Sequence, residues 1–442
     1  MSKTRTLGLL SSLSLIFALF VVLPGMGADE KDKDGKSGLY RPLGLFTEVL
    51  ALVRSNYVES VEVKPLLGGA FAGMTEAMDP FSEYVAPDKM PAFNAYLASK
   101  EKRETIDAGL VLARRFSYPV VVTAIPGSPA AAAGLKSDDV IEKIGDKATH
   151  ALGLWEIESM LAGKAGAKVR LFIVREGGKP RRRNIEIIRS SWSPTPVSVS
   201  RVDGETVVRI PTFVAGTAAQ IAAIVSPLDR TRPILLDVRG NASGTFEEAA
   251  RASALFVQAG PLGELKGRKI ATKEFRAEPG ERIHTSRLVV LVDSGTGGPA
   301  ELFAASLRES ALRENGTPQA PEPKRAAKND DGSETEEQTA IPEALRKKGP
   351  VRLVGEPTVG MGFSSQTVKL ASGGSLRLSV GKIRTSSGKS LSPKGLEPDD
   401  RVFAIPEAPA GHEQPVPAVD AILKRGLKIL TETTASAAKT AA

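Results

Sequence analysis

The stretch Ile234-Leu235-Leu236-Asp237-Val238-Arg239-Gly240-Asn241-Ala242-Ser243-Gly244 decides the fold class of this sequence. It opens with five residues that are apolar except for Asp237, a composition typical of a strand buried on both faces of a sheet. A turn with two glycines follows, and the apolar residues of 246–258 then recur at helical spacing. A buried strand that leads through a short turn into an amphipathic helix is the repeating unit of an α/β core.

Similar strands and helices alternate on both sides of this stretch. The predicted elements are strands at Val207–Ile210, Ile234–Val238, Leu288–Val292, Val351–Val354 and Ser375–Val380, and helices at Ala215–Val225, Phe246–Gln258, Ala300–Arg308 and Ala421–Leu430. Residues 317–340 contain no valine, isoleucine, leucine, methionine or aromatic residue, so they cannot bury enough apolar surface to offset the entropy of ordering. We therefore expect a crossover α/β core over 193–410 with a disordered insert at 317–340, and a C-terminal helix and tail over 411–442.

The overall composition limits the classes of protein and of chemistry. A chain of 442 residues is too long for one ordinary core, and its 41% hydrophobic and 25% charged residues predict a soluble globular protein of several domains. The absence of cysteine excludes thiol nucleophiles, disulfides and iron–sulfur clusters, and the three histidines have no ligand spacing. We expect no metal and no other cofactor. The formal net charge of +8 is modest for this length and favours no partner.

The first residues have the pattern of an export signal. Lys3 and Arg5 precede an apolar run from Leu7 to Leu23, and small residues follow up to Ala28. The pattern predicts a signal peptide or a short membrane anchor over 1–28, then a charged linker over 29–38. We expect export to the periplasm or the cell envelope, with membrane contact only through this segment.

Two regions of different character precede the α/β core. Over 39–104 the apolar residues follow helical spacing, interrupted by a turn at Asp79-Pro80. Over 105–192 the pattern changes to short strands rich in β-branched residues, with glycine and proline between them. Within this β-rich module we predict strands at Val120–Thr123, Val140–Ile144, Val169–Val174 and Ile185–Ile188, and one helix at Gly153–Leu161.

The string Gly127-Ser128-Pro129-Ala130-Ala131-Ala132-Ala133-Gly134-Leu135-Lys136-Ser137-Asp138-Asp139-Val140-Ile141 resembles the PDZ signature. The resemblance implies that a protein C-terminus adds as a strand to a sheet edge and places its carboxylate on backbone N–H groups of a glycine loop. The corresponding loop is Ala108-Gly109-Leu110-Val111, where glycine lets the backbone approach the carboxylate closely. The far wall of the groove is then the helix with Trp155, Ile157 and Leu161.

The cluster Lys179-Pro180-Arg181-Arg182-Arg183 has two interpretations. A basic run is compatible with nucleic-acid binding. It also follows two glycines at the tip of a predicted hairpin, where exposed charge is usual. We favour a solvated turn and expect no nucleic-acid partner.

Three blocks resemble the tail-specific, or carboxyl-terminal processing, serine peptidases. Leu235–Gly244 is similar to the family's L-D-L-R-N-N-P-G-G, Val354–Gly360 to V-G-E-P-T-F-G, and Gly395–Asp399 to G-I-E-P-D. With the helical region and the PDZ-like module in the same order, the resemblance covers nearly the whole chain after the linker. It implies a mixed α+β multidomain protein whose α/β core is of the ClpP/crotonase type.

The family's chemistry uses a serine nucleophile, a neutral lysine as its base and backbone N–H groups for the oxyanion. In the block that resembles V-N-E-G-S-A-S-A-S-E, the serine position is Gly298. In the block that resembles F-G-K-G, the lysine position is Met361. The resemblance also implies a supporting role for Gln366, one residue later than in the family, and oxyanion donors in the turn at Ser243 and Gly244.

Glycine has no atom that attacks a carbonyl, and a thioether accepts no proton at neutral pH, so both halves of the catalytic pair are missing. We therefore expect an inactive homologue that binds unfolded protein or peptide C-termini, as an adaptor, a decoy or a partner to an active peptidase relative. Two alternatives stay open: an active endopeptidase with a relocated nucleophile at Thr296 or Ser294, and a structural envelope protein whose groove is closed. The sequence does not determine whether the protein is a monomer or an oligomer.

Overall fold

The structure is a computed structural model that describes residues 37–102, 106–150, 152–175, 181–314, 349–404 and 420–441. The predicted signal or anchor at 1–28, most of the predicted linker and the predicted insert at 317–340 lie outside the described residues. The described residues divide into two compact units, with the boundary after Leu66.

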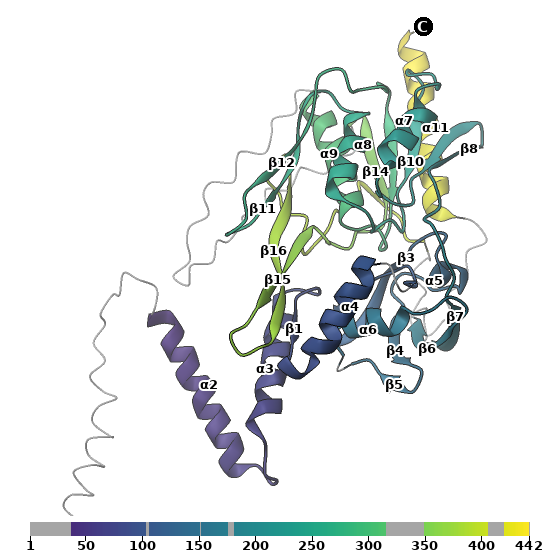
Figure 1. Cartoon of the computed structure of the whole chain (residues 1–442). Coiled ribbons are helices and arrows are strands. Elements are labelled where there is room, and N and C mark those ends of the chain that lie inside the picture. The colour runs from purple at the N-terminus through teal and green to yellow at the C-terminus, as the bar shows by residue number, and fades with distance from the viewer. Residues whose placement is uncertain are drawn as a thin grey trace, which may run out of the picture. The chain divides into compact units, whose positions relative to one another are not determined.

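The first unit contains α2 (Ser37–Asn56), and α3 (Val63–Met78) crosses the boundary to the second unit (Figure 1). Both helices confirm the helical spacing predicted for this region. Most of the described apolar side chains of α2 are exposed, including Leu43, Leu45 and Leu52. None of the described helices combines the length and the apolar composition that a bilayer crossing needs.

The described part of the core contains a sheet of six strands in the order β17-β14-β13-β10-β9-β8. Their bounds are β8 Ser198–Val202, β9 Glu205–Arg209, β10 Ile234–Asp237, β13 Leu288–Val292, β14 Val351–Gly355 and β17 Asp400–Arg401. All neighbours pair in parallel except β8 and β9. Because parallel neighbours require a crossover connection, this arrangement confirms the predicted crossover α/β fold.

Helices cover both faces of this sheet. Successive residues of β10 show the alternation, because Leu236 packs among residues of one helical layer and Leu235 packs against Ile422 and Leu427 on the opposite face. The first layer consists of α7 Thr217–Val225, α8 Phe246–Ala254 and α9 Pro299–Glu314, and the second of α11 Ala421–Ala441. All of these helices were predicted.

An antiparallel sheet of five described strands lies beside this core, and most of it was not predicted. Its strands are β1 Glu83–Val85, β11 Gly260–Lys266, β12 Lys273–Ala277, β15 Phe363–Lys369 and β16 Ser375–Thr385. The pair Glu83 and Arg377 shows how far apart in sequence the paired segments lie. Of these strands the sequence predicted only the first part of β16.

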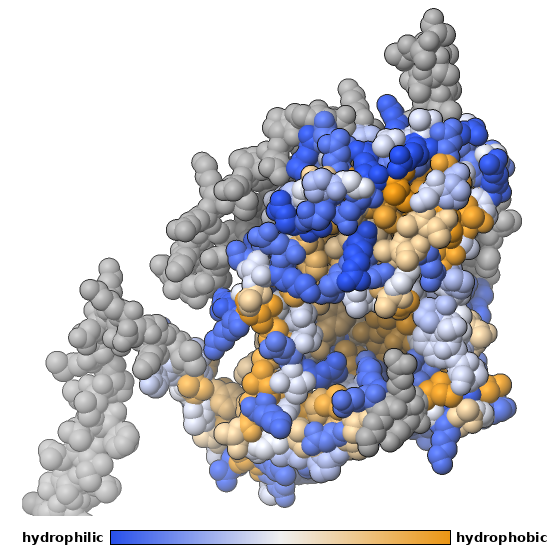
Figure 2. All heavy atoms as spheres, turned by 45° about the horizontal axis from the view of Figure 1, so that its top comes forward, coloured by the Kyte–Doolittle hydropathy of each residue, from blue (hydrophilic) through white to orange (hydrophobic). Residues whose placement is uncertain are grey.

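Figure 2 shows a hollow in the surface of the molecule, with apolar residues on its floor and hydrophilic residues on its rim.

The β-rich module is a sheet with the order β2-β3-β4-β6-β7, in which β2 is an edge strand. Its elements are β2 Leu110–Arg115, β3 Tyr118–Ala124, α5 Pro129–Ala132, β4 Val140–Ile144, β5 Lys147–Ala148, α6 Leu154–Leu161, β6 Lys168–Arg175 and β7 Arg181–Ile188. The four predicted strands and the predicted helix are confirmed. The arginines of the basic cluster lie on β7, and Arg182 pairs with Glu142 at 3.3 Å. Lys179 and Pro180 lie outside the described residues.

His284 is the one buried histidine among the described residues, with 1% of its surface exposed. Its ring packs edge-on against Phe256, and neither ring nitrogen has a hydrogen-bond partner within the described part of the chain. Burial, together with the charges of Arg282 and Arg230, lowers the pKa of His284 from 6.5 to about 4, and the charge of Asp229 opposes this shift.

Replacement of His284 by leucine should therefore reduce the loss of stability in acid. Between pH 6.5 and pH 4 the unfolded chain binds a proton at this histidine and the folded chain does not, so stability falls as the pH falls. The difference between the pKa of His284 in the unfolded chain and in the folded chain corresponds to about 3 kcal/mol of unfolding free energy. Urea unfolding at both pH values measures it, with the exposed His150→Leu as control. Equal acid sensitivity of His284→Leu and the wild type would contradict this assignment.

Candidate active site and peptide groove

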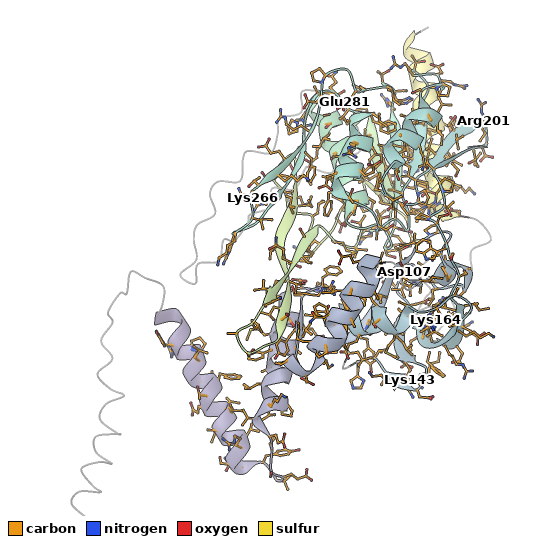
Figure 3. All side chains as sticks on the ribbon, viewed as in Figure 1. Asp107, Lys143, Lys164, Arg201, Lys266 and Glu281 are labelled. Atoms are coloured by element: carbon orange, nitrogen blue, oxygen red, sulfur yellow. The ribbon has the colours of Figure 1, made fainter. Side chains whose placement is uncertain are left out.

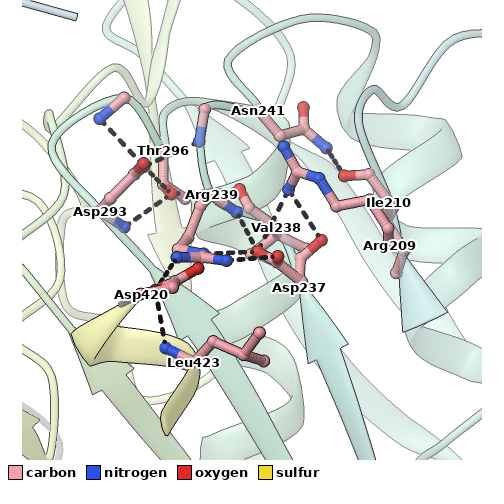
Figure 4. A network of polar contacts seen from close by, with 12 residues as sticks. Arg209, Ile210, Asp237, Val238, Arg239, Asn241, Asp293, Thr296, Asp420 and Leu423 are labelled. Carbon is pink, nitrogen blue, oxygen red and sulfur yellow. Dashed lines mark hydrogen bonds and ion pairs between the residues drawn. The ribbon is translucent and has the colours of Figure 1, made fainter. Parts of the chain in front are cut away.

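A buried ion-pair network fixes the chain where β10 ends (Figure 4). Both oxygens of Asp237 accept hydrogen bonds from Arg239, at 2.9 and 2.8 Å, and Arg209 on the neighbouring strand lies 3.2 Å from the same carboxylate. Burial acts to raise the pKa of Asp237, but the two guanidinium groups outweigh it and hold the pKa below its usual value. Arg239 also bonds Asp420 at 2.8 Å, just before α11. This network holds the start of the following turn in place.

The turn from Gly240 to Gly244 lies directly against the segment that precedes α9. The N–H of Gly240 donates to Asp293 at 2.8 Å, and the N–H of Gly297 donates to the carbonyl of Asn241 at 2.9 Å. Gly244 has a φ of +117°, and a Cβ there would lie 2.1 Å from the carbonyl oxygen of Phe213. This close approach is a structural reason for the glycine. The hydroxyl of Ser243 is buried without a hydrogen-bond partner among the described residues.

Gly298 and Met361 lie side by side in front of α9. A Cβ on Gly298 would be 3.4 Å from the carbonyl oxygen of Met361 and 3.9 Å from its Cβ. The neighbouring Gly297 comes closer still, because a Cβ there would lie 3.0 Å from the Met361 sulfur. Gly298 is buried and has a φ of +52°, a conformation that side chains disfavour. The structure therefore brings together the two positions that the sequence singled out.

The fully buried carboxylate of Glu301 joins these two positions. One of its oxygens accepts the N–H groups of Gly298 and Met361, both at 2.8 Å, and the other accepts the N–H of Gly360 and the hydroxyl of Thr358. Burial raises the pKa of Glu301 to about 7, and these four hydrogen bonds oppose the rise. Sequence reasoning assigned no role to Glu301. The signal that would have revealed its role is a glutamate at the third position of a helix, three residues after the residue that precedes the helix.

The hydroxyls proposed as relocated nucleophiles have other partners. Thr296 is completely buried, and its hydroxyl lies 2.9 Å from Asp293 and 3.1 Å from the carbonyl of Val238. The hydroxyl of Ser294 donates to Asp138 of the β-rich module at 2.9 Å. The partners of the two hydroxyls in these bonds are carboxylate and carbonyl oxygens, and none of these partners is a lysine amine.

The predicted supporting residue Gln366 and the nearby Lys382 lie on strands. Gln366 is exposed on β15, where it pairs across the sheet with Leu378. Lys382 on β16 lies over the ring of Phe363, 5.8 Å from its centre. Among the described residues, no three acidic or histidine side chains converge in a way that could hold a metal ion.

A cavity of about 630 Å³ lies between the start of β2 and the end of α6. It is lined by Ala108, Gly109 and Leu110 of the predicted loop, by Leu161, and by residues of α4 (Met90–Lys102). Val111 does not line it. Gly109 has a φ of +72°, and a Cβ there would lie 2.1 Å from the Cβ of Ser128, so the loop requires glycine.

Two of the three residues expected in the groove wall do not line this cavity. Trp155 does not line the cavity but packs edge-on against Phe93 at 5.3 Å between ring centres, in a cluster with Tyr96. Ile157 faces the interior of the β-rich module and has no exposed surface. The helix α4 packs on α6, and Phe93 and Tyr96 of α4 form this cluster with Trp155.

The family comparisons agree with this architecture. Residues 206–314 and 334–402 match peptidase family S41, and residues 120–175 match the PDZ domain. The core of this chain therefore belongs to peptidase family S41, and a PDZ domain precedes it.

Individual relatives give the same result over most of the chain. The carboxy-terminal processing protease CtpA of Bacillus subtilis is 27% identical over 357 residues, which cover 78% of this chain and just under two thirds, 66%, of that protein. The carboxy-terminal-processing protease of Bartonella bacilliformis is 25% identical over 390 residues, covering 86% of this chain and 80% of the relative. A solved photosystem II D1 C-terminal processing protease matches 81% of this chain and 86% of its own, with a TM-score of 0.58. At 21% identity that likeness shows the fold alone.

Proposed function

We propose that this protein is an exported homologue of the carboxy-terminal processing proteases that binds protein C-termini and does not hydrolyse them. The observation that carries the proposal is that Gly298 and Met361 lie side by side, where the family's chemistry needs a hydroxyl beside an amine. Loss of either member of such a pair removes most catalysis, and loss of both adds little further loss. The export part rests on the apolar run at Leu7–Leu23 alone.

The fixed hydroxyls near this position support the same conclusion. A nucleophile must lie within a fraction of an ångström of its productive position, because catalysis falls steeply with misplacement. Thr296 is held by Asp293 and Val238, and Ser294 is held by Asp138. Moving either hydroxyl to Gly298 would break these bonds, so the geometry favours loss of hydrolysis over a relocated nucleophile.

The binding part rests on the groove of the PDZ domain. The edge strand β2 offers backbone groups to an extended peptide, and the cavity beside it supplies apolar contacts from Leu110, Leu112 and Leu161. An open cavity at this edge argues against the alternative of a structural protein with a closed groove. Unfolded protein or peptide C-termini are therefore the proposed ligands, with an active peptidase relative as a further proposed partner.

A glycine replacement in the loop tests the binding proposal. Gly109→Ala should abolish binding of a short fluorescent peptide that ends in leucine with a free carboxyl group, because the added Cβ would meet Ser128 and displace the loop. Gly134→Ala is the matched control, since Gly134 has a similar φ of +83° but open space around its Cβ position. We expect Gly134→Ala to bind like the wild type in a fluorescence anisotropy titration.

Two results would oppose the binding proposal. Absence of peptide binding by the wild type would remove recognition from the proposed function. Equal binding by wild type and a folded Gly109→Ala variant would place the ligand at another site.

A further inference from the structure

Asp107 precedes β2 (Figure 3), and it is one of the residues that line the cavity. Its carboxylate accepts a hydrogen bond from the N–H of Gly109 at 2.7 Å. Gly109 is the residue whose positive φ and lack of a side chain shape the carboxylate-binding loop of the proposed groove. A carboxylate of this chain thus already bonds one N–H group of the loop.

The backbone around Asp107 is fixed by Trp192. The indole N–H donates to the carbonyl of Asp107 at 3.1 Å, and the ring lies 2.9 Å from the Cβ position of Gly109. Gly109 also accepts a backbone hydrogen bond from Ile125 at 2.8 Å, which ties the loop to the end of β3. With the backbone held on both sides, the Asp107 carboxylate bonds the Gly109 N–H group although the residue is exposed to solvent.

The charges that line the cavity reinforce this arrangement. Three charged side chains are among the described lining residues, namely Lys100, Asp107 and Glu158. Lys100 lies 3.4 Å from Glu158 and donates to the Tyr96 hydroxyl at 3.2 Å. Its positive charge is therefore partly offset by Glu158 in the cavity wall. The lining therefore carries a net negative charge at neutral pH, which opposes an incoming carboxylate.

We propose that Asp107 is a built-in competitor for the terminal carboxylate of the ligand. A peptide C-terminus offers the same chemical group as the Asp107 side chain, and both need the N–H of Gly109. Binding of a free C-terminus then requires Asp107 to leave that N–H group, which lowers the affinity and makes Asp107 a specificity-determining residue. This inference rests on the proposed peptide recognition and concerns the same groove.

The test compares two probes that differ only at the end group. One is the leucine-ended fluorescent peptide with a free carboxyl group, and the other is the same peptide as a C-terminal amide. Asp107→Ala in the full chain should bind the free acid about tenfold more tightly than the wild type, which corresponds to the worth of one charge-assisted hydrogen bond, and should bind the amide unchanged.

Two further variants test the role of the Asp107 charge. One keeps an acceptor for the Gly109 N–H group without the charge, and the other is a control. The affinity of Asp107→Asn for the free acid should fall between those of the wild type and Asp107→Ala. The asparagine oxygen still accepts the hydrogen bond from Gly109 but carries no charge. Asp146→Ala removes an exposed carboxylate in the β4–β5 turn of the same domain, outside the cavity lining, and should leave both affinities unchanged.

The results also separate this inference from the proposed function. If the wild type binds the free acid and Asp107→Ala binds it equally or more weakly, the competitor role is wrong while peptide recognition stands. An equal gain for the amide would likewise overturn it, because the effect would not depend on the ligand's carboxylate. If none of these proteins binds either peptide, peptide recognition itself fails.

Discussion

Gly298→Ser/Met361→Lys should turn a protein without detectable hydrolysis into a peptidase, with a rate at least about 10²-fold above that of the wild type. The two positions are already adjacent, since a Cβ on Gly298 would lie 3.9 Å from the Cβ of Met361. The N–H groups of both positions are also held by Glu301. A fluorogenic unfolded protein substrate measures the gain.

The single variants are the matched controls for this result. Gly298→Ser alone has a hydroxyl without a base, and Met361→Lys alone has a base without a nucleophile, so neither should exceed the wild-type rate appreciably. A folded double variant that remained inactive would contradict the view that the catalytic pair alone is missing. The turn at Ser243 and Gly244 would then be the first place to look for a further loss.

Glu301→Leu should lower the free energy of unfolding by about 3 to 5 kcal/mol. Glu301 has no exposed surface, and its removal would leave four donors around Gly298, Thr358, Gly360 and Met361 without their acceptor. Urea unfolding followed by circular dichroism measures the loss. Glu301→Gln should also destabilise, because its amide nitrogen would face donors that need an acceptor.

Glu247→Leu is the surface control for this prediction. Glu247 pairs with Lys273 where both side chains are about half exposed, so its loss should cost less than about 1 kcal/mol. Equal effects of the two replacements would show that Glu301 does not hold the site together.

Sequence reasoning predicted the core well where a local pattern suffices. The strand Leu288–Val292 was predicted with the bounds that the structure has, because five consecutive apolar residues leave little other interpretation. The antiparallel sheet was mostly missed, since strands such as β1 (Glu83–Val85) are short and pair with segments far away in the sequence, here β16. Long-range pairing of this kind has no local signal.

The candidate site shows the same limit. The sequence singled out Gly298 and Met361 through a resemblance to a family, and the structure places the two residues side by side. That they stand at the positions of the family's catalytic serine and lysine stays a proposal. Arg209 was missed because its contact with Asp237 depends on the register of two parallel strands. Trp155 was misplaced because the packing of α4 on α6 cannot be read from the spacing of apolar residues.

The most direct test of the central claim is an assay of the purified wild-type chain with an unfolded protein substrate, read by mass spectrometry of the products. The absence of a hydroxyl and an amine at Gly298 and Met361 predicts no cleavage above the substrate-only blank. Turnover by the wild type that disappears in Thr296→Ala or in Ser294→Ala would contradict it, because one of those hydroxyls would then be the nucleophile.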